Sequence, residues 1–268
     1  MSDRARSEEL ADYARRLHAR GWVANHDGNL TVRLQPGRYL ATPTAMSKAA
    51  VTAEEILVVD ESGAKISGRG KPFSEIGLHL TVYRNRPDVN AVVHAHPPTA
   101  TGFAVAGVEL GAPAVAEAVV SLGAGVPTVP FAAPGPSACD ALAPFVLDHD
   151  AVLLAGHGVL AWGADVEQAY LRCELVEHLA RIALVARQLG GVRPIPAAVV
   201  PSLLEARAKA GLGPRARGGK PTVVACAPPP PGSDVEVYDP KRAKAAVLPS
   251  PTDLATIIRQ EIANALKK

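Results

Sequence analysis

The stretch that decides the fold is FSEIGLHLTVYRNRPDVNAVVHAHPP, residues 73–98, because it leads a helix directly into a strand. Ser74 is a suitable N-cap for a helix that stops at Pro87. The small apolar residues that follow predict a buried strand with His94 and His96 near its end. Alternate side chains of a strand lie on the same face, so these two imidazoles point the same way. They either share a metal ion or are two hydrogen-bonded histidines at a strand end.

Strands and helices interleave along the rest of the chain, which indicates a mixed α and β fold. A helix is expected at residues 7–18, and a longer one begins after Asp165, a suitable N-cap, and is closed by two glycines. TATGFAVAG is expected to be helical. Strands are expected in the following segments: GNLTVRL, RYLAT, EILVVD, VPTVPF and the two halves of AVLLAGHGVLAWG.

Composition restricts the class of protein. With 268 residues, 48% of them hydrophobic, the chain can build a core as one large domain or two small ones. The charged start MSDRARSEEL and the lack of an 18-residue apolar window indicate neither secretion nor membrane spanning. A net charge of +2, with a short basic run at 214–220 that lacks aromatic neighbours, argues against nucleic acid as a partner. The odd number and wide spacing of the three cysteines argue against disulfides or a thiolate zinc site and fit a reducing cytoplasm: Cys139, Cys173 and Cys226.

The composition changes sharply after Cys226, which predicts three parts. Residues 1–225 are expected to form the folded body, and residues 226–251 are rich in proline and charge, as expected for an extended or disordered linker. Residues 252–268 return to helical periodicity with an apolar face, which predicts a short amphipathic helix.

A third candidate metal ligand is His157, in LLAGHGVLAWG. The glycines on both sides leave room for the backbone to bend and for the imidazole to reach a shared centre. Three neutral histidines suit a catalytic zinc ion, which keeps a fourth position for water or substrate. The other five histidines are interpreted as exposed or capping residues: His18, His26, His79, His149 and His178.

Glu75 is the candidate acid/base partner of such a metal, because a carboxylate beside a divalent cation can move a proton. Its position equally suits a glutamate that stabilises the first turn of a helix. A second set of small or hydroxyl-bearing residues stands at loop ends and at a helix start, where phosphate oxygens bind well, although each is individually also a common turn or cap residue. These residues are Gly28, Asn29, Thr42, Thr44 and Ser74.

Four segments together resemble the class II aldolase/adducin family: GNLTVRL, ATPTAMSK, FSEIGLHLTVYRNRPDVNAVVHAHPP and LLAGHGVLAWG. The resemblance covers roughly residues 5–215, and its most specific parts are the S-E, H-x-H and H-G motifs in this order. It implies that His94, His96 and His157 bind one Zn²⁺ per chain and that Glu75 is the catalytic acid/base. It also assigns phosphate binding to four residues: Gly28, Asn29, Thr44 and Ser74.

The same resemblance implies an α/β fold of three layers, α/β/α, with a central mostly antiparallel sheet. It also implies a homotetramer with active sites at subunit interfaces. The chain departs from the family pattern at Ala45, where family aldolases have glycine, and at Phe73, where they have serine. Family aldolases use a tyrosine of a neighbouring subunit beyond H-x-H as a proton donor, but no tyrosine lies between Tyr83 and Tyr170 here. These departures concern the phosphate site and the proton relay, whereas the metal ligands are complete.

The activity expected from the resemblance is zinc-dependent aldol cleavage of a ketose 1-phosphate, such as L-fuculose 1-phosphate. The products would be dihydroxyacetone phosphate and an aldehyde such as lactaldehyde. Alternatives are a sugar-phosphate epimerase or dehydratase of the same family and a non-enzymatic adducin-like scaffold. The linker and terminal helix resemble the encapsulation peptides that recruit enzymes into bacterial microcompartments, which predicts a shell protein as partner of residues 252–268 and a cytoplasmic or microcompartment location. Alternatively, this helix packs on the body or bridges subunits.

Overall fold

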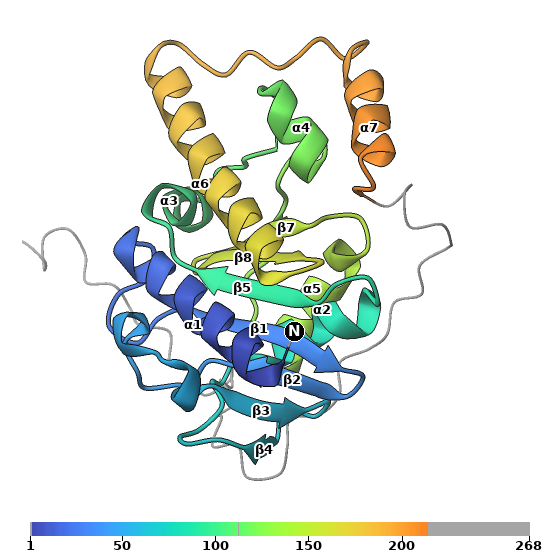
Figure 1. The fold of residues 1–268 in the computed structure, drawn as a ribbon. Coiled ribbons are helices and arrows are strands. Elements are labelled where there is room, and N and C mark those ends of the chain that lie inside the picture. The colour runs from blue at the N-terminus through green and yellow to red at the C-terminus, as the bar shows by residue number, and fades with distance from the viewer. Residues whose placement is uncertain (1, 112, 214–268) are drawn as a thin grey trace, which may run out of the picture. The chain divides into compact units, whose positions relative to one another are not determined.

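The computed structural model describes residues 2–111 and 113–213, and an eight-stranded sheet runs through this part of the chain (Figure 1). The strand order across the sheet is β4-β3-β2-β1-β5-β8-β7-β6. Neighbouring strands are antiparallel, except that β6 and β7 are parallel. The strands are β1 (Asn29–Gln35), β2 (Arg38–Ala41), β3 (Leu57–Asp60), β4 (Lys65–Ser67), β5 (Ala91–Ala95), β6 (Thr128–Val129), β7 (Ala151–Leu154) and β8 (Gly158–Gly163).

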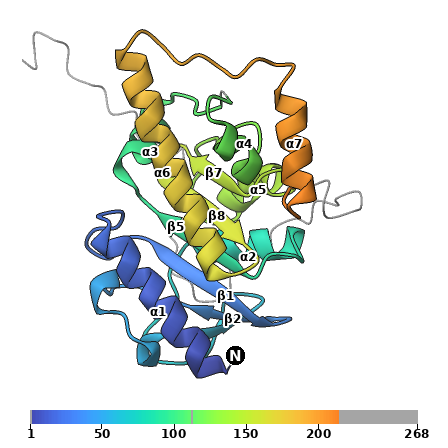
Figure 2. The same ribbon diagram turned by 45° about the horizontal axis from the view of Figure 1, so that its top comes forward.

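Helices cover both faces of the sheet (Figures 1 and 2). α1, α3 and α6 pack on one face around one apolar cluster, and α2 and α5 pack on the other face around a second. The helices are α1 (Asp3–Ala19), α2 (Ile76–Asn85), α3 (Pro98–Ala106), α4 (Ala116–Leu122), α5 (Pro136–Val146), α6 (Val166–Gln188) and α7 (Val200–Lys209), with short 3₁₀ turns at Lys48–Ala50 and Ala53–Glu55. The expected three-layer α/β/α fold with a mostly antiparallel sheet is confirmed.

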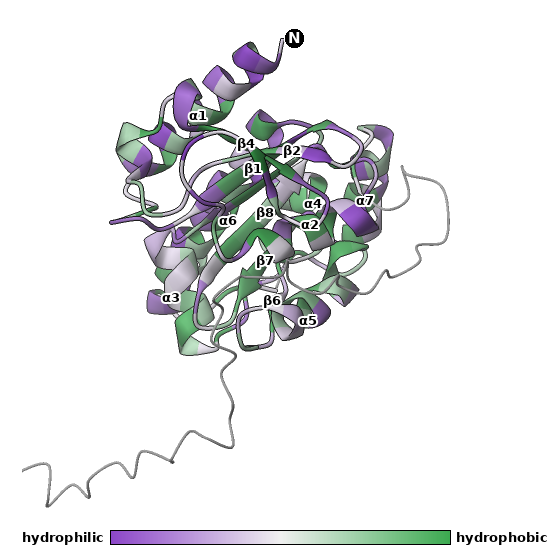
Figure 3. Ribbon diagram, turned by 90° about the horizontal axis from the view of Figure 1, so that it is seen from below, coloured by the Kyte–Doolittle hydropathy of each residue, from purple (hydrophilic) through white to green (hydrophobic). Residues whose placement is uncertain are grey.

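Strand β5 lies at the centre of the sheet and all five of its residues are buried. Val93 belongs to the apolar cluster under α1 and α6, whereas Val92 belongs to the cluster under α2 and α5. Both faces of the strand are therefore apolar, which is why its sequence reads as a continuous apolar run. Figure 3 shows the central strands in green and purple residues on α1. His94 shares the Val92 face, so the metal-site candidate lies on the α2 side.

Two expected boundaries need correction. Helix α2 begins at Ile76 with Glu75 at its N-cap, rather than with Ser74 there, and the Glu75 side chain makes no hydrogen bond to the helix. The strand expected in VPTVPF is reduced to Thr128–Val129, because the prolines on both sides have no amide proton to donate to a neighbouring strand.

Three elements were not expected from the sequence. Strand β4 has three exposed residues at the edge of the sheet, and α4 spans only seven residues. Helix α7 buries a single residue, Arg207, so it has no apolar stripe that periodicity could detect.

The expected linker at 226–251 and the expected helix at 252–268 lie outside the described residues, as does the boundary at 225. Within the described part of the chain, the longest apolar stretches of helix fall short of what crossing a membrane requires.

Candidate active site

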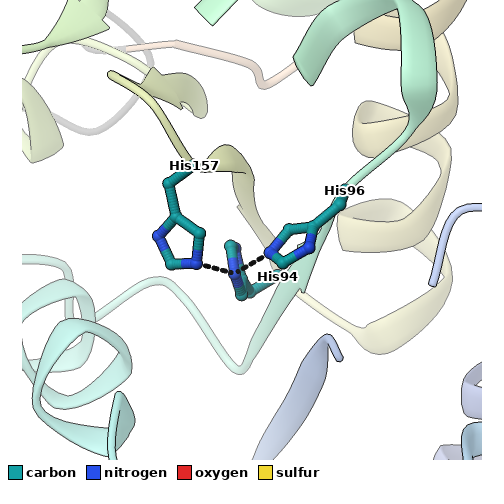
Figure 4. A group of neighbouring side chains, drawn as sticks. All are labelled: His94, His96 and His157. Atoms are coloured by element: carbon teal, nitrogen blue, oxygen red, sulfur yellow. Dashed lines mark hydrogen bonds between the residues drawn. The ribbon is translucent and has the colours of Figure 1, made fainter. Parts of the chain in front are cut away.

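Three histidines converge where strand β5 ends and strand β8 begins (Figure 4). His94 lies on β5 and His96 directly follows this strand, while His157 lies in the turn between β7 and β8. The pairing of β5 with β8 places His94 opposite Leu160 and so brings the turn beside H-x-H. His94 Nε2 lies 3.0 Å from His96 Nε2 and 3.3 Å from His157 Nε2.

Gly158 allows this close approach of the turn to the end of β5. A Cβ atom at position 158 would lie 2.6 Å from the Ala95 carbonyl oxygen and 2.6 Å from Cδ2 of the His96 ring. Any larger residue would therefore displace backbone or a candidate ligand. The glycine that follows His157 serves the contact between strands, in addition to the bending expected from the sequence.

The protonation of His94 suits metal binding. Its Nδ1 lies 2.9 Å from the Val159 carbonyl oxygen, which can only accept, so the ring proton is on Nδ1 and the Nε2 lone pair faces the other two rings. Nitrogen ligands of a tetrahedral zinc ion lie about 3.3 Å apart, given a Zn–N bond of about 2.0–2.1 Å. The donor set and its spacing therefore fit a shared divalent ion.

Burial keeps two of the three imidazoles neutral. It lowers the pKa of His94 to about 4 and also lowers the pKa of His96. The pKa of His157 is instead raised, because its ring is hydrogen-bonded to the carboxylate of Glu75. Metal ligation requires neutral imidazole, so His94 and His96 are ready to bind at neutral pH.

Glu75 places its carboxylate against the histidine cluster. Glu75 Oε1 lies 3.0 Å from His157 Nε2, and Oε2 lies 3.5 Å from His94 Nε2. Asn29 Nδ2 donates to Oε2 at 2.9 Å. Burial alone would raise the pKa of Glu75, but the neighbouring His94 and His157 and the bond from Asn29 bring it well below its usual range. Glu75 is therefore a carboxylate at neutral pH.

The candidate phosphate residues do not all lie in one place. Gly28 adopts φ +68° and a Cβ atom there would lie 3.0 Å from the His94 carbonyl oxygen, so it borders the histidine cluster. Thr42 is fully buried, and its hydroxyl accepts from the amide of Leu30, which gives it a structural role. Thr44 and Ser74 are both exposed, and the Thr44 amide donates to the Lys71 carbonyl oxygen just before Ser74.

Two further residues border the site and were not expected from the sequence. Asp27 Oδ2 lies 3.6 Å from His96 Nδ1, on the side of the ring away from the cluster. Lys48 is 1% exposed and donates to the carbonyl oxygens of His26 and Met46, which ties together the two loops beside Gly28 and Thr44. The position of Asp27 directly before Gly28 and Asn29 could have identified it as a site residue. No feature of the sequence around Lys48 indicates that this lysine is buried.

Comparison with known proteins finds one family model and several sugar-phosphate aldolases that are similar to this chain. The family model for the class II aldolase and adducin N-terminal domain matches residues 8–184. The chain is 30% identical to a 5-deoxy-D-ribulose 1-phosphate aldolase of Bacillus thuringiensis, over 70% of this chain and 89% of that protein. It is 32% identical to an L-fuculose phosphate aldolase of Methanococcus maripaludis, over 68% and 97% of the two chains.

A relative with a different reaction is about as similar. The chain is 32% identical to the 3-oxo-tetronate 4-phosphate decarboxylase of Escherichia coli K12, over 70% of this chain and 88% of that protein. Among solved structures, YgbL of Klebsiella pneumoniae superposes with a TM-score of 0.70 at 31% identity, covering 76% of this chain and 99% of that one.

Proposed function

The chain belongs to the class II aldolase and adducin family, and we propose on this premise that it is a zinc-dependent lyase that cleaves a ketose 1-phosphate. The observation that carries the proposal is the convergence of three histidine nitrogens with one carboxylate, in which Glu75 Oε1 is 3.0 Å from His157 Nε2. Such a site suits a reaction that develops negative charge beside a carbonyl group. L-Fuculose 1-phosphate and 5-deoxyribulose 1-phosphate are the first substrates to test. Two similar proteins are a 5-deoxy-D-ribulose 1-phosphate aldolase and an L-fuculose phosphate aldolase.

His94, His96 and His157 would hold the ion. When bound, a divalent zinc ion polarises the substrate carbonyl and stabilises the charge that develops on its oxygen. The chain's own contribution is to present neutral imidazoles in one place and to keep the Glu75 carboxylate beside them. Gly28, Asn29, Thr44 and Ser74 are proposed to bind the phosphate, although Asn29 is already engaged with Glu75.

Glu75 would carry the proton through the reaction. As a carboxylate it takes the proton of the hydroxyl group on the carbon that becomes the aldehyde carbon. The bond between this carbon and the carbon next to the ketone then breaks, and its electron pair moves toward the ketone oxygen. The protonated Glu75 then returns the proton to the carbon left behind. Dihydroxyacetone phosphate and an aldehyde result, lactaldehyde if the substrate is L-fuculose 1-phosphate. A single carboxylate can serve both transfers in sequence.

The test is a screen of ketose 1-phosphates with added zinc, with release of dihydroxyacetone phosphate as the readout. Glu75→Gln should lose at least ~10²-fold in turnover, because an amide cannot act as a base, while phosphate-ligand affinity is largely kept. Glu61→Gln is the matched control, since Glu61 is exposed and lies outside the site. Equal turnover in the Glu75→Gln variant and the parent would remove Glu75 from the mechanism.

Metal binding is tested separately from turnover. The parent protein should carry about one divalent ion per chain, and His94→Ala should lose it because the most buried ligand is gone. His18→Ala, at an exposed position on α1, should stay fully loaded. If metal analysis finds as much zinc in His94→Ala as in the parent, the ligand assignment is wrong.

Decarboxylation of a 3-oxo acid phosphate is the second candidate. Loss of carbon dioxide needs no base to take a hydroxyl proton, so it requires one proton transfer fewer than aldol cleavage, although the carbon left behind must still receive a proton. It is also the reaction for which a relative at 32% identity is named. Release of carbon dioxide in place of an aldehyde would select it. An epimerase or dehydratase would release neither, and an adducin-like scaffold would turn over none of the compounds.

A homotetramer and recruitment to a microcompartment shell by residues 252–268 complete the proposal. Support for recruitment comes from the sequence alone, namely a proline-rich segment followed by helical periodicity. A fusion of residues 227–268 to a fluorescent protein should co-purify with shells when co-expressed with shell proteins. If the fusion stays outside the shells, or if deletion of residues 250–268 dissociates the tetramer, recruitment is rejected.

A further inference from the structure

A row of buried polar side chains joins helix α2 to strand β1 and leads away from the Glu75 carboxylate. Glu75, His79 and Tyr83 follow one another at four-residue spacing, so they lie along one side of the helix. Asn29 and Thr31 alternate on β1 and share one face of the sheet. Asn29 Nδ2 donates to Glu75 Oε2 at 2.9 Å, and Thr31 Oγ1 lies 2.8 Å from both His79 Nδ1 and the Tyr83 hydroxyl. We call these five residues the α2–β1 polar row.

Helix α2 does not by itself hold the Glu75 carboxylate in place. Glu75 is the N-cap residue, but its side chain makes no hydrogen bond to the helix amides and turns to the histidine cluster instead. Outside that cluster, its hydrogen-bond partner in the described part of the chain is Asn29, on a different element. The position of the carboxylate therefore depends on how α2 is seated on β1.

Strand β1 in turn is registered against the strand that carries a candidate metal ligand. Asn29 lies opposite His94 in the antiparallel ladder, and Thr31 lies opposite Val92. A contact that locks α2 to β1 at Thr31 therefore also fixes α2 relative to His94. Thr31 and His79 form such a contact. It is a buried hydrogen bond, and His79 lies one helical turn beyond Glu75.

Thr31 links the side chains of His79 and Tyr83 through two buried hydrogen bonds. Burial raises the pKa of Tyr83, so the phenol keeps its proton. Among the described residues, the acceptor within reach of that phenolic proton is Thr31 Oγ1. Thr31 carries one hydroxyl proton, so it donates to one of these two partners and accepts from the other. His79 is neutral because its burial lowers the pKa of the imidazole, and its Nε2 is buried with no hydrogen-bond partner among the described residues.

We propose that His79 is a positioning residue for the candidate acid/base Glu75, acting as a neutral imidazole through Thr31 and β1. The inference rests on the proposed function, because Glu75 has to be the group that moves the proton. It also corrects the expectation that His79 is an exposed or capping histidine: the residue is 0% exposed and sits in the core between α2 and the sheet. Its ring meets Phe73 edge-on, with the centroids 5.0 Å apart.

The experiment compares two substitutions at position 79 with one at its partner. His79→Phe keeps a flat ring but removes both nitrogens, whereas His79→Asn places an amide group where Nδ1 lies and can still accept from Thr31. His79→Phe should lower kcat about 10- to 100-fold, the range seen when outer partners of an active-site group are removed, with KM and metal content unchanged. His79→Asn should recover most of kcat. Thr31→Val should lose as much as His79→Phe, and the double variant should lose little more.

A second readout does not depend on turnover. In the metal-free protein, ¹⁵N-detected imidazole spectra should show His79 neutral, and Thr31→Val should change the signal of its Nδ1. His178→Phe is the matched control, because His178 is exposed on α6 and should give parental kcat. Should His79→Phe fail to fold, Thr31→Val carries the test, and a parental kcat there overturns the inference.

The outcomes separate this inference from the function on which it rests. Parental kcat in metal-loaded His79→Phe, next to an inactive Glu75→Gln, overturns the role of His79 alone. Parental kcat in Glu75→Gln rejects the proposed function, and the role of His79 with it. A variant that is less stable but unchanged in kcat shows that His79 serves the core only, which also overturns the inference.

Discussion

Asp150→Asn is expected to lower the free energy of unfolding by about 3–5 kcal/mol, because Asp150 neutralises three buried guanidinium groups. Its side chain is 0% exposed. Arg86 at the end of α2 contacts it at 2.8 Å and Arg172 of α6 at 3.2 Å, and Arg207 of α7 also donates to it. The carboxylate thus connects three helices at the start of β7, and it is the point at which α7 is anchored to the body.

The magnitude follows from what each arginine retains. Arg86 keeps the partly exposed Asp88, which together with Asp150 raises the pKa of Arg86 although burial would lower it. Arg207 otherwise donates to the carbonyl oxygens of Val120 and Ser121, which carry no charge. Removing one partner of a buried ion pair costs about 3–5 kcal/mol because the remaining charge stays buried. The upper half of that range is expected, since Asp150 contacts three buried guanidinium groups at once.

Urea unfolding followed by circular dichroism measures the effect, with the slope of the transition checked for a two-state comparison. Asp148→Asn is the matched control: this neighbour is exposed, so its loss should change stability by no more than about 0.5 kcal/mol. An Asp150→Asn variant that loses less than about 1 kcal/mol, at an unchanged slope, would refute the view that this carboxylate holds the cluster together.

Two other predictions concern the surroundings of the site. Burial lowers the pKa of Lys48 from 10.5 to about 8, so between these pH values the unfolded chain binds more protons than the folded one and stability should rise with pH. Relative to Lys48→Met, the free energy of unfolding of the parent, measured by urea unfolding, should rise by at most about 3 kcal/mol across this pH window. If the free energies of the two proteins change with pH in parallel, the prediction is wrong. Gly158→Ala should weaken zinc binding about 10- to 100-fold in a competition titration, because its Cβ atom would lie 2.6 Å from the His96 ring. Gly102→Ala is the control: a Cβ atom there would have no neighbouring atom of the described residues within 4 Å, so this variant should bind zinc as the parent does.

The sequence by itself determined the features that depend on neighbours along the chain. The helix before H-x-H, the buried strand that carries His94 and the long helix after Asp165 were predicted from periodicity and from start and stop signals, and the structure has them as α2, β5 and α6. The common face of His94 and His96 follows from the two-residue repeat of a strand. His157 was identified as the third candidate by its flanking glycines and the family resemblance, and the structure places it beside the other two.

Other features became visible only in the tertiary structure. The hydrogen bond of Asn29 to Glu75 and the contact of Thr31 with His79 join residues 46 and 48 positions apart, and the ion pairs of Asp150 with Arg86 and Arg207 join residues 64 and 57 positions apart. Periodicity describes one helix or strand at a time. It therefore predicts that a polar residue is exposed even where a second element covers that residue. Whether a histidine such as His79 lies in water or in the core depends on how α2 is seated on β1, and this seating results from side-chain packing across the whole sheet.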